Sequence, residues 1–166
     1  MKFSKILMQG IICLFLLSTL VGCTSFSSNY KGLVVPSKNL ILLQKEGSHN
    51  GKWQAEDISV SYHYTRSVDV LKISGRIDFA DSLKGNFTRL EDFDLWIYFV
   101  NSENKIVGNT GTSPFTAFNE IEAAPFEKIV ELPADTQAMV FAYSGRASDV
   151  GGEGELHHTF WKTPLG

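Results

Sequence analysis

The stretch Ile58-Ser59-Val60-Ser61-Tyr62-His63-Tyr64-Thr65 decides the fold class, because apolar and polar residues alternate along it. Successive side chains of a β-strand point to opposite faces, so this pattern predicts a strand with one buried face. A second alternating run covers residues 71–79, and a turn near Arg66-Ser67 separates the two runs. The two runs therefore predict an antiparallel hairpin.

The rest of the chain continues this strand-rich pattern. Residues 93–100 are apolar on both faces beyond Asp94, which predicts a central strand covered on each side. Further strands are expected at residues 33–43, 105–108, 126–132, 137–143 and 158–162. We expect loops at residues 44–51, 80–91 and 145–154, and an irregular stretch at 111–125. With no convincing amphipathic helix after residue 22, these elements predict an all-β antiparallel β-sandwich of seven or eight strands, which we favour over a barrel.

One corner of the chain has a family resemblance. An alternating run ends at Leu132, Pro133-Ala134-Asp135-Thr136 follows, and a small apolar run leads to Tyr143. This order is similar to the corner between late strands of immunoglobulin-like and fibronectin-like sandwiches. The resemblance covers about a dozen residues, and the cysteine and tryptophan hallmarks of the immunoglobulin fold are missing. It implies an immunoglobulin-like strand arrangement.

The amino terminus reads as an export signal. Lys2 and Lys5 precede an apolar run over residues 6–17, and Leu20-Val21-Gly22-Cys23 follows. The run is too short and too interrupted to span a membrane. Leu20-Val21-Gly22-Cys23 resembles the lipobox of bacterial lipoproteins. That resemblance implies cleavage between Gly22 and Cys23, a diacylglyceryl group on the Cys23 thiol and acylation of its new amino group. The alternative is ordinary secretion with a cut after Ser25.

These signals divide the chain into three parts. Residues 1–22 are a cleaved signal peptide, residues 23–32 are the lipidated Cys23 and a polar tether, and residues 33–166 are one domain. The nine tether residues after Cys23 reach at most ~30 Å, so the domain is expected to lie close to its membrane. Some lipoproteins of bacteria with two membranes carry an Asp after the lipidated cysteine, which holds them in the inner membrane. Thr24 departs from that pattern, so the resemblance favours the outer membrane, facing the periplasm.

Charge and cysteine content exclude several classes of function. Loss of Lys2 and Lys5 leaves 13 Lys and Arg residues against 18 Asp and Glu, so the net charge changes from -3 to -5. An acidic domain is not expected to bind nucleic acid, or to bind anionic lipid through a cluster of basic residues. Cys13 falls in the signal and Cys23 is the expected lipid site, so the mature domain has no disulfide available.

No motif predicts a metal, a cofactor or a catalytic group. The best metal candidates gather near the carboxyl end: Asp149, Glu153, Glu155, His157 and His158. The two histidines are adjacent, so on a strand they point to opposite faces, and we predict no metal site. The acidic run at residues 91–94 lacks the glycine turn of a calcium loop. The chain has no Gly-x-Ser-x-Gly or His-Glu-x-x-His motif, and nothing in the sequence positions a third group beside a serine and His49 or His63.

Two aromatic residues are the candidate contacts for a ligand or partner. Trp96 and Tyr98 fall on one face of their strand, and exposed rings there could stack on a sugar or on a protein surface. The alternative is that the second sheet and a loop cover both faces of this strand.

Three functions remain. The first is a lipid-anchored, non-catalytic accessory or interaction module of the cell envelope, whose partners are membrane lipid, through acylated Cys23, and an envelope protein. The second is a small-ligand or glycan-binding β-sandwich, and the third is an envelope enzyme.

Overall fold

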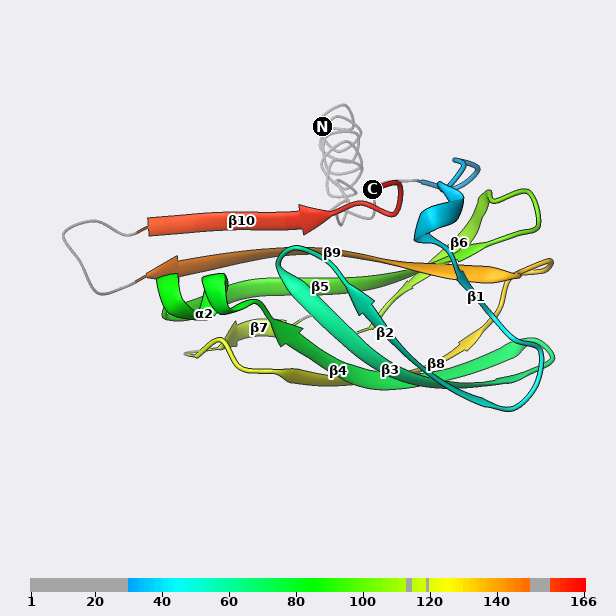
Figure 1. The fold of residues 1–166 in the computed structure, drawn as a ribbon, viewed down its shortest axis with the longest axis horizontal. Coiled ribbons are helices and arrows are strands. Elements are labelled where there is room, and N and C mark those ends of the chain that lie inside the picture. The colour runs from blue at the N-terminus through cyan, green and yellow to red at the C-terminus, as the bar shows by residue number, and fades with distance from the viewer. Residues whose placement is uncertain (1–29, 113–114, 119, 150–155) are drawn as a thin grey trace, which may run out of the picture.

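The computed structural model describes residues 30–112, 115–118, 120–149 and 156–166. The signal, Gly22 and Cys23, and all of the tether before Tyr30 lie outside these residues. Strands are the main secondary structure of the described part, which also has one short α-helix and one 3-10 helix (Figure 1). Its elements are η1 (Ser37–Asn39), β1 (Ile41–Leu42), β2 (Ser48–Gln54), β3 (Ile58–Ser67), β4 (Val70–Phe79), α2 (Asp81–Asn86), β5 (Arg89–Val100), β6 (Ile106–Gly111), β7 (Phe115–Phe118), β8 (Ala124–Glu131), β9 (Ala138–Asp149) and β10 (Leu156–Lys162).

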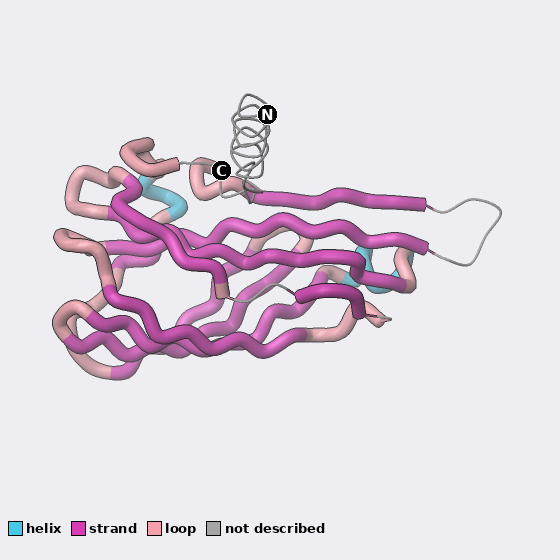
Figure 2. The backbone as a smooth tube through the Cα atoms, turned by 180° about the vertical axis from the view of Figure 1, so that it is seen from behind, coloured by secondary structure: helices cyan, strands magenta, loops and turns pink. Residues whose placement is uncertain are grey.

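The strands form two antiparallel sheets. One has the order β2-β3-β4-β8. In the other, β9 and β5 lie at the centre, β1 and β10 pair with β9, and β6 and β7 pair with β5. Figure 2 shows the long strands of both sheets running along the length of the domain. The prediction of an all-β antiparallel sandwich is confirmed at this level.

The hairpin predicted from the alternating runs is β3 and β4, which pair from Ile58↔Phe79 to Ser67↔Val70. Their apolar positions face the other sheet, and the fully buried side chains there include Ile58, Leu71, Ile73 and Ile77. From the other sheet, Phe93, Leu95, Ile97, Phe99 and Phe141 complete this inner core. Burial of these side chains is the main stabilising term of the fold.

Several expected boundaries are wrong. A strand, β2, occupies much of the loop expected at residues 44–51, and the helix α2 lies in the loop expected at 80–91. A short strand, β7, lies in the stretch expected to be irregular. Strand β9 continues past Tyr143 to Asp149, so Gly145 lies in a strand and not in a loop. The described residues therefore hold ten strands, more than the seven or eight expected.

A second apolar cluster lies on the opposite face of β5 and β9. Tyr98, Val100, Val140 and Ala142 are buried there together with Val35. The residues that cover this cluster come from both ends of the described chain, namely Tyr30, Leu40 and Leu165. The Asn39 side-chain amide donates a 3.4 Å hydrogen bond to the carbonyl of Leu165, which joins the two covering segments. We call residues 30–40 the strap.

Candidate functional site

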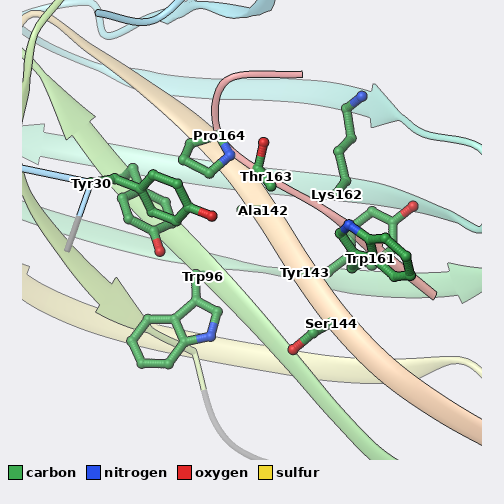
Figure 3. Close-up of a pocket in the computed structure, with 10 residues that line it drawn as sticks. Tyr30, Trp96, Ala142, Tyr143, Ser144, Trp161, Lys162, Thr163 and Pro164 are labelled. Atoms are coloured by element: carbon green, nitrogen blue, oxygen red, sulfur yellow. The ribbon is translucent and has the colours of Figure 1, made fainter. Parts of the chain in front are cut away.

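A concavity rich in aromatic residues lies beside the strap, on the face of the β9 sheet that points away from the inner core. It is a shallow groove with a cavity of about 40 Å³. Figure 3 shows its walls, which come from the strap, from β5 and β9, and from β10 with the residues after it. Among the residues that line it are Tyr30, Trp96, Ser144, Trp161, Lys162 and Pro164. We call this the outer groove.

Strand register brings these side chains together. Ser144 of β9 lies between Asp94 of β5 and Trp161 of β10 in one row across the sheet. Trp96 is two residues from Asp94 on β5, so it points to the same face and lies opposite Ala142. Four separate segments of the chain thus meet at one surface, and only the pairing of β5, β9 and β10 makes this possible.

The structure separates the two predicted contact residues. Tyr98 is only 3% exposed, and its ring meets the Tyr30 ring edge-on at a centroid distance of 5.5 Å. Burial raises the pKa of Tyr98 to about 12, and the nearby Tyr30 adds to the rise. An exposed platform of both rings is therefore excluded, because the strap covers Tyr98. For Tyr98 the alternative agrees with the structure, because the strap that covers it is an irregular segment with turns and one 3-10 helix.

Trp96 is half-buried at the edge of the groove. Three of its ring carbons lie 3.4–3.6 Å from the position that a Cβ on Gly111 would occupy, so the indole covers the backbone of Gly111 on β6. A Cβ at position 111 would be in ordinary van der Waals contact with the ring. Trp96 thus has the position of a contact residue, and its role in contact with a ligand stays a prediction.

Trp161 lies in the strand expected at residues 158–162 and was not among the predicted contact residues. It is 65% exposed, whereas its neighbour Phe160 is 3% exposed and belongs to the inner core. This alternation along β10 is the signal that could have marked Trp161 as a surface ring. Trp53, by contrast, faces the core and packs on Phe141 with a centroid distance of 5.5 Å.

A charged cluster extends the groove along the same face. Arg146 contacts Glu91, and its guanidinium lies 3.1 Å from a carboxylate oxygen of Asp92. Nδ1 of His157 lies 3.1 Å from the other carboxylate oxygen of Glu91. Partial desolvation raises the pKa of Glu91, but Ser148 and the charges of Arg146 and His157 outweigh it and hold the pKa below its ordinary value. Because Arg146 and His157 are well exposed, these pairs add little to stability.

The metal candidates do not converge. His157 contacts Glu91, whereas the His158 ring stacks on Phe87 at 5.4 Å and an interplanar angle of 13°. Asp149 accepts a 3.2 Å hydrogen bond from the Thr88 hydroxyl. Glu153 and Glu155 lie outside the described residues. Within the described ranges, no group of three His, Cys, Asp or Glu side chains has an arrangement that could hold a metal ion.

One expectation about catalytic groups needs correction. Asn50 does position a histidine beside a serine, because Asn50 Oδ1 lies 2.9 Å from Nδ1 of His63 and the Ser48 hydroxyl lies 3.3 Å from its Nε2. The sequence hid this trio because its members come together only by the pairing of β2 with β3. All three residues are exposed. A hydrolytic site also needs donors for an oxyanion in a place shielded from water, so this trio alone supports no catalytic function.

Comparison with known proteins assigns no family: no family model matches the chain, and no curated protein matches it in sequence. In the part of the chain that the structure describes, no helix is long and apolar enough to cross a membrane.

Proposed function

We propose that the protein is a lipid-anchored, non-catalytic interaction module of the cell envelope. The observation that carries this proposal is Leu20-Val21-Gly22-Cys23 after a basic start and a short apolar run. In a host with two membranes the domain is held at the outer membrane and faces the periplasm, which rests on Thr24 in place of an Asp. Its partners are membrane lipid, bound through acylated Cys23, and an envelope protein.

The anchor is persistent because of its acyl chains. Each buried methylene of an acyl chain contributes about 0.8 kcal/mol, so two or three chains hold a protein where one chain binds only marginally. Only residues 24–29 separate Cys23 from Tyr30, the first described residue of the fold. This segment spans at most about 20 Å when extended. The proposed anchor therefore keeps the outer groove, of which Tyr30 is a wall, close to the bilayer.

The anchor is tested by growing cells with an alkyne analogue of palmitate and comparing two cysteine variants. Cys23→Ala is expected to abolish lipid labelling and to leave an uncleaved precursor. Cys13→Ala is the matched control, since Cys13 lies in the segment that is removed, and it is expected to label like the wild type. Labelling of Cys23→Ala at the wild-type level would overturn the proposal. Separation of the two membranes on a density gradient tests the location.

The envelope partner is tested by crosslinking in intact cells. A crosslinker on the surface of the wild-type domain is expected to capture the same envelope protein repeatedly, and the captured protein is expected to be lost with Cys23→Ala, which removes the domain from its membrane. Capture that does not depend on Cys23 would argue against an interaction at the membrane.

A further inference from the structure

We propose that the outer groove binds a neutral glycan, namely a chain of pyranose rings with equatorial hydroxyl groups, such as β-1,4-linked glucose or N-acetylglucosamine. This inference deepens the proposed function, on which it rests, by naming the class of ligand that an envelope module of this kind binds. It is carried by three features of the groove: two indole rings with available surface, polar groups between them, and an open shape.

The two indoles have the form that sugar rings require. Pyranoses with equatorial hydroxyls present flat patches of C–H groups, and these pack on the faces of aromatic rings. Trp161 offers most of its surface, being 65% exposed. Trp96 lies against the backbone of Gly111 on one side, and Figure 3 shows its ring face-on in the groove. Tyr30 and Pro164 add apolar surface between the tryptophans and the covered cluster.

Hydroxyl groups of a sugar need both donors and acceptors at the same surface. The Ser144 hydroxyl lies at the groove, because its side chain points to the same face as those of Trp96 and Trp161. Asp94 of β5 is the register partner of Ser144 of β9, so the two side chains lie on the same face of the sheet. A carboxylate accepts hydrogen bonds and a serine hydroxyl both donates and accepts them, so a neutral ligand rich in hydroxyl groups can pair with both.

The charges beside the groove argue against an anionic ligand. Asp94 adjoins the groove and disfavours an anionic bilayer surface or an anionic partner, whereas Glu91 and Asp92, earlier on the same strand, are paired with Arg146. An isolated organic cation is another ligand class that aromatic rings bind, and the test below includes one. We therefore expect a neutral ligand, because the charges of Glu91, Asp92 and Arg146 on this face are paired with one another.

The size of the groove points to a polymer lying across the surface. A cavity of about 40 Å³ is far below the roughly 300–1,000 Å³ of sites that enclose a small molecule. One sugar ring cannot be enclosed here, so binding energy comes from several rings that each touch part of the surface. Weak affinity, with a Kd in the millimolar range, is expected for each short oligosaccharide.

The test titrates the mature lipoprotein, held in a detergent without a sugar headgroup, with chitotetraose and with cellotetraose. Binding is followed by tryptophan fluorescence and by isothermal calorimetry. The wild type is expected to bind at least one of the two saturably, and Trp161→Ala is expected to weaken binding about tenfold, the loss of one stacked ring. Leu156→Ala is the matched control, because Leu156 is 64% exposed on the same strand. It is expected to bind like the wild type.

Each other outcome overturns the inference. The inference is overturned if neither sugar binds saturably. It is also overturned if the Trp161→Ala variant has the same affinity as the Leu156→Ala variant. Tetramethylammonium chloride and vesicles of phosphatidylglycerol are titrated alongside, and a response to either that depends on Trp161, with none to the sugars, would assign the groove to that ligand class. The anchor and the glycan site fail separately. If the wild-type protein binds sugar but is not labelled with lipid, the anchor is refuted. If it is labelled with lipid but binds no sugar, only the glycan site is refuted.

Discussion

Gly75 lies where two strands and an aromatic ring come closest. A Cβ at this position would meet the backbone carbonyl oxygen of Ser61 and come within 2.7 Å of the Phe126 ring. Because the first of these atoms belongs to a paired strand, it cannot move aside cheaply. We predict that Gly75→Ala lowers the free energy of unfolding by about 3 kcal/mol, measured by urea denaturation.

The matched control for this prediction is Gly85→Ala. Gly85 lies in α2, with no heavy atom within 4 Å of the place that a Cβ would take. Alanine has the higher helix propensity, so this variant is expected to be neutral or more stable by up to about 1 kcal/mol. Equal effects of the two substitutions would show that close approach at Gly75 is not what excludes a side chain.

Buried tyrosines predict a loss of stability at alkaline pH. Burial raises the pKa of Tyr98 from 10.0 to about 12. Burial also raises the pKa of Tyr143, as does the adjacent Asp57 carboxylate, which accepts a 2.7 Å hydrogen bond from the Tyr143 hydroxyl. Since these pKa values are higher in the folded state, the unfolded chain loses its phenolic protons first as the pH rises.

Stability from these groups is complete below pH 10 and falls as the pH rises from 10 towards 12. Urea denaturation at pH 8, 10 and 11 is expected to give a lower free energy of unfolding at pH 11 than at pH 8, with most of the fall between pH 10 and 11. Tyr143→Phe is expected to flatten this decline, since its ring cannot ionise. A free energy that stays constant to pH 11 would contradict the burial of these hydroxyls.

At the scale of elements, the strap forms a third layer over the second apolar cluster, on the outer face of β5 and β9. Adjacent residues of the strap differ sharply: Val35 is 0% exposed in the second cluster, whereas Val34 is 58% exposed. Val35→Ala is expected to cost about 2 kcal/mol of stability in urea denaturation, from lost burial and the cavity left behind. Val34→Ala changes the same atoms on the open side and is expected to stay within about 0.5 kcal/mol of the wild type.

Equal costs for the two valines would mean that the strap does not cover Tyr98 and Val140. The outer groove would then lose one of its walls, because Tyr30 lies in the same segment. This comparison therefore checks the site as well as the fold.

How far the sequence predicts the elements depends on how many faces each strand buries. Strands β3, β4 and β5 have strong apolar patterns, and all three were predicted. Strand β2 is an edge strand whose only large apolar residue is Trp53, so its polar and glycine residues read as a loop. In β9, Gly145 looked like a loop residue, yet a Cβ there would come within 3 Å of the Phe160 ring, so the glycine serves packing.

The candidate site was only partly predictable, because its surroundings come from segments that are distant in sequence. Trp96 and Tyr98 were found from one strand, but whether each is covered depends on the strap, which is distant in sequence. Trp161 joins Trp96 only through the pairing of β10 with β9 and of β9 with β5. Contacts that depend on strand order leave no local signal in the sequence.

At the scale of the whole molecule, the two apolar clusters share their central strands. Ile97 and Phe99 of β5 belong to the inner core, while Tyr98 and Val100 of the same strand belong to the outer cluster. Strand β9 divides its residues in the same way, with Phe141 inside and Val140 outside. Loss of either strand would expose both clusters, so the domain is expected to unfold as one cooperative unit.

The three tryptophans make this cooperativity measurable. Trp53 packs against the inner core, Trp96 against the outer cluster, and Trp161 is exposed. We therefore predict the behaviour of two variants of the mature protein, one keeping only Trp53 and the other only Trp96, with phenylalanine at the remaining two positions. In each variant, the urea midpoint from tryptophan fluorescence is expected to equal the midpoint from far-ultraviolet circular dichroism.

Because each variant is compared with its own circular dichroism curve, a change in overall stability caused by the substitutions cancels. A fluorescence midpoint for the Trp96 variant that falls below its circular dichroism midpoint would contradict the prediction. It would mean that the strap and the outer cluster open before the sheets separate, as a local unfolding unit. The outer groove would then exist for only part of the time in the native protein, and the affinity for any ligand would be reduced by the fraction of molecules that are open.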